Sequence, residues 1–260
     1  MPPAPSRIRS LLITRPAGLA DEFAVHLQGL GVEPIALPLI EIAPPPDPAQ
    51  LAAVLSRLPD CHWALFVSPS AVRMGLAAIR SHLSGLPESV RLAAIGEGSA
   101  KPLREALGRP VLIPPVEADS EGLLACAEMQ SIAGQRVMLF RGVGGRTLLA
   151  DTLTARGATV FPAVCYERRG LTPDLTALRA RWRSGNVNGN GVDAVWVTST
   201  EILDQLVRVL GEVDRELLQA TPVFVPHPRI AAAAEAYGVR DVRLIGPGDA
   251  GLLAALSGSD

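Results

Sequence analysis

The sequence has few aromatic residues, almost no lysine and few cysteines. Aromatic residues make up 4% of the 260 residues, so the hydrophobic cores must be built mainly from Ala, Leu, Val and Ile. Lys101 is the single lysine among 24 basic residues, and the rest are arginines, which hold carboxylates with a rigid two-pronged fork. The formal net charge of -2 argues against a nucleic-acid-binding protein.

Other absences bear on compartment and cofactors. The three cysteines, Cys61, Cys126 and Cys165, lie far apart and form neither a CxxC motif nor a zinc-like spacing. No apolar run approaches the roughly 20 residues that span a bilayer, and the Pro-rich start does not read as a secretory signal. We therefore expect a soluble, cytoplasmic protein with reduced cysteines, no metal, no cofactor and no membrane or nucleic-acid partner.

Strand-like apolar runs alternate with helix-like runs along nearly the whole chain. Strands are predicted near 11–14, 34–42, 63–67, 91–95, 111–113, 136–140, 158–167, 193–197, 222–225 and 242–245, with helices between most of them. Single helices are predicted from Asp119 to about Gln130 and around 174–182. This alternation predicts parallel sheets covered on both faces, with ligands beyond the carboxyl ends of the strands.

The chain also resembles itself. Leu11–Arg15 matches Val137–Arg141, Trp63–Ser68 matches Ala194–Ser199, and Leu92–Leu124 matches Val223–Leu253. The first strand of one unit lies at the N-terminus, whereas its later strands lie in the C-terminal third, so one unit is inserted within the other.

The repeat defines the predicted fold. We predict an α/β protein of two similar flavodoxin-like parallel-sheet domains joined by a two-stranded linker. The outer domain comprises residues 1–37 and 168–260, the inserted domain 44–160, and the linker 38–43 and 161–167. A ligand site is expected between two such domains.

Several stretches, in this order, carry a resemblance to a known family. They are Thr14-Arg15-Pro16, Phe66 to Val72, Ala94 to Ala100, Ser120 to Leu123, Arg141 to Arg146, Tyr166-Glu167 and Val197 to Ser199. With this spacing the chain resembles uroporphyrinogen-III synthases from about Ser10 to Leu256. One departure is the sequence Pro226-His227-Pro228-Arg229, where many relatives have a Gly-x-x-Thr-Ala-like turn, so any ligand contacts of that turn must pass to other groups such as Arg229.

The resemblance implies a reaction. Hydroxymethylbilane, a linear tetrapyrrole with eight carboxylates, loses its terminal hydroxyl as water and closes to uroporphyrinogen III with ring D inverted. The pyrroles supply the nucleophile, so the resemblance implies a lyase of haem biosynthesis without metal or redox cofactor. We expect a monomer, with transient contact with hydroxymethylbilane synthase as a route for handing over the substrate.

Tyr166 is the candidate catalytic residue, because the resemblance implies a tyrosine there as proton donor to the departing hydroxyl. A phenol is a weak acid but a competent hydrogen-bond donor. We expect Tyr166 in the linker, facing either a cleft or solvent. The alternative is a tyrosine that packs the linker.

Carboxylates bind arginines and the free N–H groups of helix N-termini. The candidate substrate-binding residues lie in the strand-to-helix turns; they are Arg15, Ser68, Ser70, Gly96, Ser99, Arg141, Gly142, Gly144, Arg146, Thr198, Ser199 and Arg229. Each of these turns could instead be only a cap or a tight turn, and each arginine only a surface charge. His227 is interpreted as a helix cap, and Trp63 and Trp196 as core residues.

Two other functions stay open from the sequence. A non-catalytic, two-lobed module that binds small molecules would keep the fold and the arginines but would not need Tyr166. A dinucleotide-dependent enzyme is a third reading, because Gly142-Val143-Gly144 resembles the start of a GxGxxG motif. Thr147 stands where its third glycine should be.

Overall fold

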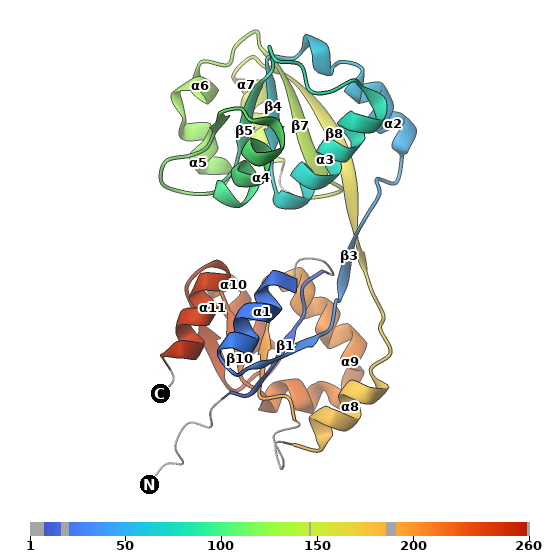
Figure 1. Cartoon of the computed structure of the whole chain (residues 1–260), viewed down its shortest axis with the longest axis vertical. Coiled ribbons are helices and arrows are strands. Elements are labelled where there is room, and N and C mark those ends of the chain that lie inside the picture. The colour runs from blue at the N-terminus through green and yellow to red at the C-terminus, as the bar shows by residue number, and fades with distance from the viewer. Residues whose placement is uncertain (1–7, 17–20, 146, 186–190, 259–260) are drawn as a thin grey trace. The chain divides into compact units, whose positions relative to one another are not determined.

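The computed structural model describes residues 8–16, 21–145, 147–185 and 191–258 (Figure 1). Contacts within the chain divide it into two compact units. Unit 1 comprises Met1–Glu41 and Arg169–Asp260, and unit 2 comprises Ile42–Arg168. Each unit has its own sheet and its own pair of hydrophobic clusters, so each is described by itself.

Unit 1 is built on a five-stranded sheet in the order β11-β10-β9-β1-β2, in which every pairing is parallel. The strands are β1 (Ser10–Ile13), β2 (Glu33–Ala36), β9 (Ala194–Trp196), β10 (Val223–Val225) and β11 (Val242–Leu244). The helices are α1 (Asp21–Gly29), α8 (Thr176–Arg183), α9 (Thr200–Ala220), α10 (Pro228–Ala236) and α11 (Gly248–Ser257). The three inner strands are buried throughout, as expected for strands covered on both faces.

A second sheet, in the order β3-β8-β7-β4-β5-β6, lies mostly in unit 2. Its strands β3 and β8 cross the boundaries between the units, which fall after Glu41 and after Arg168. The strands are β3 (Ile40–Ala43), β4 (Trp63–Phe66), β5 (Arg91–Ala94), β6 (Val111–Leu112), β7 (Arg136–Gly142) and β8 (Thr159–Gly170), and β8-β7-β4-β5-β6 pair in parallel. The helices are α2 (Pro48–Leu55), α3 (Pro69–His82), α4 (Glu97–Leu107), α5 (Ser120–Ala125), α6 (Ala127–Gln130) and α7 (Leu148–Ala155), with a 3₁₀ turn at Leu58–Asp60.

The strands that the sequence repeat matched occupy the same places in the two sheets. Unit 1 reads β2-β1-β9-β10-β11 and unit 2 reads β8-β7-β4-β5-β6. In unit 1 the first two strands come from the N-terminal segment and the others from the C-terminal segment. The order of strands in space is therefore shared, although the order along the chain is not.

The structure corrects two details of the sequence prediction. Residues 161–166, expected in the linker, lie inside β8 and pair with β7 from Met138 to Gly142, so they belong to the sheet of unit 2. The single helix expected from Asp119 to Gln130 is two helices, because Cys126 has extended backbone angles (φ -62°, ψ 140°) between α5 and α6.

Aromatic residues occupy the centres of the cores. Trp63 is 3% exposed and Trp196 is fully buried, which confirms both as core residues. In unit 2 the rings of Phe66 and Phe140 stack at 4.4 Å between centroids. Gly75 of α3 permits this pair, because a Cβ there would lie 2.7 Å from the Phe140 ring. No helix within the described ranges is both long and apolar enough to cross a membrane.

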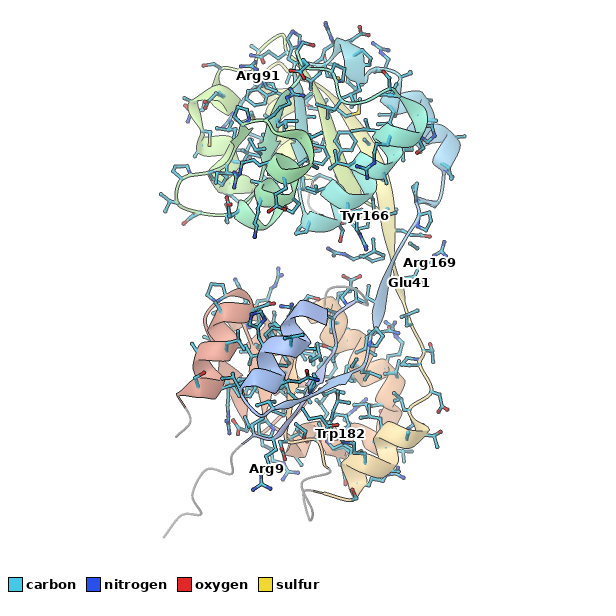
Figure 2. All side chains as sticks on the ribbon, in the orientation of Figure 1. Arg9, Glu41, Arg91, Tyr166, Arg169 and Trp182 are labelled. Atoms are coloured by element: carbon cyan, nitrogen blue, oxygen red, sulfur yellow. The ribbon has the colours of Figure 1, made fainter. Side chains whose placement is uncertain are left out.

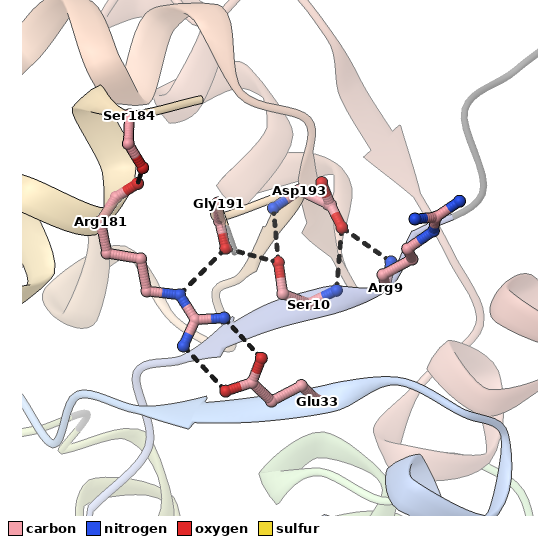
Figure 3. A network of polar contacts seen from close by, with 7 residues as sticks. All are labelled: Arg9, Ser10, Glu33, Arg181, Ser184, Gly191 and Asp193. Carbon is pink, nitrogen blue, oxygen red and sulfur yellow. Dashed lines mark hydrogen bonds and ion pairs between the residues drawn. The ribbon is translucent and has the colours of Figure 1, made fainter. Parts of the chain in front are cut away.

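The amino end of the unit 1 sheet is held by a polar network (Figure 3). The Asp193 carboxylate accepts hydrogen bonds from the backbone N–H groups of Arg9 and Ser10, at 2.7 and 2.9 Å. Arg181 donates to both carboxylate oxygens of Glu33, at 2.8 and 2.5 Å. These contacts fix β1 and β2 at the amino end of the unit 1 sheet, opposite to the turns that follow the strands of the same sheet.

Candidate active site

Four adjacent strands of unit 2 end at one edge of the sheet. In register, Phe66 of β4 lies beside Phe140 of β7 and Ala94 of β5, and Gly142 of β7 lies beside Tyr166 of β8. The turns that follow β4, β5 and β7 therefore lie next to one another, as parallel strand order requires. This carboxyl edge collects the unit 2 candidates, and we call it the unit 2 edge.

Tyr166, which is labelled in Figure 2, is hydrogen-bonded to Ser68 at the unit 2 edge. The two hydroxyl oxygens lie 3.1 Å apart, and either can donate. Ser68 is also the N-cap of α3, where its Oγ accepts the Ala71 backbone N–H at 3.0 Å. The Ser-Pro start of α3 thus holds the serine in place, and the serine holds the phenol.

The Tyr166 ring packs directly over Gly142. A Cβ at Gly142 would lie 2.7 Å from two ring atoms of Tyr166, so no other residue fits without moving the ring. Tyr166 is 3% exposed, so of the two positions expected from the sequence it does not have the one facing solvent. The backbone N–H of Val143 donates to the Tyr166 carbonyl at 2.9 Å, which ties the glycine-rich turn to the end of β8.

A pocket of about 210 Å³ opens at this edge. Its lining combines hydroxyls, the glycine-rich turn, apolar side chains and an arginine that follows Tyr166 in the chain: Ser68, Ser120, Tyr166, residues 141–145, Val67, Ile95, Leu139, Leu149 and Arg168. A larger pocket of about 440 Å³ shares residues 141–144 but is lined otherwise mainly by prolines and by α2. The smaller pocket has the hydroxyl groups, so we take it as the candidate active site.

Arg141 is bonded to its own turn. Its guanidinium donates to the carbonyls of Gly142 and Gly145, both at 3.3 Å, and to the carbonyl of Gly144. Gly144 and Gly145 have φ values of 71° and 80°, a conformation that other residues rarely adopt. Arg141 therefore shapes the turn that lines the pocket, in addition to its expected role as a carboxylate partner.

The other unit 2 candidates lie at helix starts. Gly96 is the N-cap of α4 and a Cβ there would lie 2.9 Å from the Cβ of Ala118, so a side chain would collide. Ser99 is buried in the first turn of α4, and Ser70 is half-buried in the first turn of α3. Arg146 lies outside the residues that the structure describes.

The carboxyl edge of the unit 1 sheet, which we call the unit 1 edge, carries charged side chains. Arg15 follows β1, and its guanidinium carbon lies 3.9 Å from the centroid of the Trp196 ring. The same guanidinium forms a two-pronged ion pair with Asp249 at the start of α11, with one contact of 3.1 Å. No role for Asp249 was predicted from the sequence. Asp249 lies far from Arg15 along the chain, so the sequence does not indicate that the two residues form a pair.

The remaining unit 1 candidates follow β9 and β10. Ser199 caps α9 by accepting the Ile202 N–H at 3.2 Å, and Thr198 beside it is half-buried. His227 caps α10 through Nδ1, which accepts the Arg229 N–H at 3.1 Å. This confirms His227 as a cap, and it leaves the Arg229 side chain exposed in the first helical turn.

The thiol of Cys165, which directly precedes Tyr166 in the chain, is buried. Burial raises the pKa of Cys165 to about 12, so it stays protonated at neutral pH. Its sulfur lies 3.4 Å from the Arg141 carbonyl and acts as a packing group. Groups of three or more metal-ligating side chains are not found in the parts of the chain that the structure covers.

The geometry places the chain among α/β proteins with parallel sheets and a pocket at the carboxyl ends of the strands. Comparison with known proteins is more specific. The sequence profile of the family described as uroporphyrinogen-III synthase HemD matches residues 21–244. The chain therefore belongs to the uroporphyrinogen-III synthase family.

One relative supports this membership, and two solved structures share the fold. The chain is 34% identical over 236 residues to the uroporphyrinogen-III synthase of Escherichia coli (strain K12), covering 90% of this chain and 94% of that protein. A crystal structure of a mutant uroporphyrinogen III synthase from Thermus thermophilus aligns with a TM-score of 0.61 at 18% identity, over 96% of this chain and 98% of that one. The Helicobacter pylori 26695 enzyme aligns with a TM-score of 0.58 at 15% identity, over 96% and 99%.

Proposed function

We propose that the protein is a uroporphyrinogen-III synthase, which closes hydroxymethylbilane to uroporphyrinogen III with loss of water and inversion of ring D. The observation that carries the proposal is the hydrogen-bonded Tyr166–Ser68 pair in a pocket at the unit 2 edge, in a chain that belongs to this family. A non-catalytic binding module of the same fold is not favoured by the matches, which are to the enzymes.

The first step is departure of the terminal hydroxyl, which must gain a proton to leave as water. In our proposal the Tyr166 phenol supplies this proton. Ser68 already accepts the Ala71 N–H, so its own hydrogen can be directed at the Tyr166 oxygen. As the phenol proton moves to the substrate, negative charge grows on that oxygen, and the Ser68 hydroxyl and the positive end of α3 stabilise it.

The later steps need little chemistry from side chains. The far pyrrole attacks the azafulvene through its substituted carbon, and a spiro intermediate forms, fragments and recloses. The protein must hold the chain of pyrroles while this occurs. We propose that the N–H groups at the starts of α3, α4 and α9 and the arginines Arg15, Arg141 and Arg229 bind substrate carboxylates, with Arg146 as a further candidate.

Several finer points belong to the same proposal. The enzyme would be a lyase that works as a cytoplasmic monomer without a cofactor and that receives its substrate from hydroxymethylbilane synthase. The two units would be flavodoxin-like domains, joined by the strands β3 and β8. The strand order β2-β1-β9-β10-β11 supports this, because it is the flavodoxin order 2-1-3-4-5 within the unit.

The test is the isomer of the product. Freshly generated hydroxymethylbilane is incubated with the protein, and the oxidised products are separated by isomer. We expect predominantly the type III isomer. The type I isomer alone, which forms spontaneously without ring inversion, would contradict the proposal and would favour the binding module.

A further inference from the structure

The ion pair between Arg15 and Asp249 occupies an arginine that the proposed function needs for a substrate carboxylate. The side chain of Arg15 is 15% exposed and that of Asp249 is 44% exposed. Both carboxylate oxygens of Asp249 are bonded to the guanidinium, which is the geometry in which arginine binds any carboxylate. A substrate carboxylate that approaches Arg15 therefore meets a carboxylate of the protein in its place.

Arg15 is held independently of Asp249. Its guanidinium carbon lies 3.9 Å from the Trp196 ring centroid and 5.4 Å from that of Phe23. Trp196 is fully buried and Phe23 is 2% exposed, so this aromatic surface is fixed by the core. The stacked guanidinium would stay in position when Asp249 leaves, ready for another carboxylate.

Asp249 can leave at small cost. It lies in the first turn of α11, which spans ten residues, and a carboxylate there is stabilised by the helix N-terminus without a partner. Asp214 in the same unit shows the opposite case. Its side chain is 3% exposed and is bonded to Arg179 and Arg183, so a charge is buried and must stay paired.

We propose that Asp249 is an internal competitor that occupies Arg15 in the free enzyme and is displaced by a carboxylate of the substrate. The inference rests on the proposed function, and it assigns to Asp249 a role in setting affinity. When one carboxylate replaces the other on Arg15, the guanidinium stays paired throughout. Because the substrate must displace Asp249, it binds more weakly than it would bind to an unoccupied Arg15.

The test is Asp249→Asn, which removes the charge and keeps the size of the side chain. We expect KM for hydroxymethylbilane to fall by about two- to fivefold, the range that a partly exposed ion pair supplies. Equilibrium binding of uroporphyrin III, the stable oxidised macrocycle with the same eight carboxylates, should tighten by a similar factor. Arg15→Gln introduced into Asp249→Asn should abolish the gain.

Asp241→Asn is the matched control. Asp241 pairs with Arg243 at 2.7 Å, its side chain is 45% exposed, and Arg243 lies 5.4 Å from the Phe224 ring. Asp241 directly precedes β11, so the pair belongs to the amino end of the same sheet. We expect KM and uroporphyrin III binding to stay within the error of the wild type in this variant.

Two failures can be told apart. If the wild type forms the type III isomer but Asp249→Asn leaves KM unchanged or raises it, Asp249 is a structural or orienting partner of Arg15 and the competitor proposal is wrong. If the wild type forms only the type I isomer, the proposed function fails first. Binding of uroporphyrin III, measured without turnover, then still decides whether Asp249 and carboxylates compete for Arg15.

Discussion

The carboxyl edges of the two sheets have the same architecture and different chemistry. Each follows the same order of strands, and each has a serine that caps the helix after the central strand, Ser68 in unit 2 and Ser199 in unit 1. The unit 2 edge adds the Tyr166 hydroxyl and a glycine-rich turn, next to Arg141 and Arg168. The unit 1 edge adds an arginine stacked on tryptophan and paired with an aspartate.

The difference suggests a division of work. A proton donor needs a defined position and a partner for its oxygen, and the unit 2 edge supplies both. In our proposal carboxylate binding needs charge that can change partners, and Arg15 and Asp249 supply it at the unit 1 edge. In this proposal one fold gives two sites, because the strands set where the turns lie and the residues of each turn set its chemistry.

Removal of the Tyr166 hydroxyl should have the largest effect on kcat, because only the unit 2 edge carries the proposed proton donor. For Tyr166→Phe we expect kcat to fall by about tenfold to hundredfold, at the low end for general acid catalysis because the azafulvene forms readily. The type III isomer should remain the product. Tyr237→Phe is the control, because it removes a hydroxyl that donates to Asp204 at 2.8 Å in unit 1. Equal losses in the two variants would contradict a role for Tyr166 in proton transfer.

Displacement of the ring should have the next largest effect. In Gly142→Ala the new Cβ would lie 2.7 Å from the Tyr166 ring, so the ring must shift. We expect kcat to fall by about tenfold and the free energy of unfolding by about 1–3 kcal/mol, the usual cost of overpacking. Gly29→Ala, where a Cβ meets no described atom within 4 Å, should change neither. Normal turnover by Gly142→Ala would show that the position of the phenol does not matter.

The two capping serines provide a smaller and more direct comparison. Each accepts one N–H of its helix, so Ser68→Ala and Ser199→Ala should both lower the free energy of unfolding by about 1 kcal/mol. Only Ser68 contacts Tyr166, so we expect kcat to fall by about threefold in Ser68→Ala and by less in Ser199→Ala. Thermal denaturation and steady-state kinetics measure the two effects, and a kcat loss as large in Ser199→Ala would remove the distinction between the edges.

The smallest effect is expected at the opposite ends of the sheets. In unit 1 the hydrogen bond from Arg181 lowers the pKa of Glu33 in the folded state, whereas in unit 2 the neutral Gln135 bonds to Trp63 and Arg91. A lowered pKa means that the contribution of Glu33 to stability is present above its ordinary pKa and is lost as the pH falls through the folded-state value. Glu33→Gln should therefore have a lower Tm than the wild type at neutral pH, and this difference should close in acid. A Tm difference that is independent of pH would contradict the ion pair as its cause.

The sequence predicted the architecture more fully than the site. Helix starts such as Ser68-Pro69 and His227-Pro228 are local, because a cap depends on two or three neighbouring residues, and both were predicted. The break at Cys126 was missed, since neither proline nor glycine marks it. Arg141 was expected to face a ligand, and its bonds to the carbonyls of its own turn depend on backbone angles that composition does not reveal.

The contacts that define the sites join distant parts of the chain. Ser68 and Tyr166 are 98 residues apart, and Arg15 and Asp249 are 234 residues apart. Ser68, Tyr166 and Arg15 were each predicted as site residues, and Asp249 was not. The order of the strands in each sheet brings the two partners of a pair together. Both pairs are therefore seen in the structure, and neither could be predicted from the spacing of the residues along the chain.

The discontinuous course of unit 1 has a consequence for biosynthesis of the chain. Its inner strand β1 pairs with β9, and the N–H of Ser10 bonds to Asp193, 183 residues later. Unit 2 is contiguous and can fold as soon as Arg168 has left the ribosome, whereas β1 and β2 must wait for the last third of the chain. During translation the apolar strand β1 thus lacks its partner β9, and the speed at which the final segment emerges governs how long β1 can pair with a wrong strand.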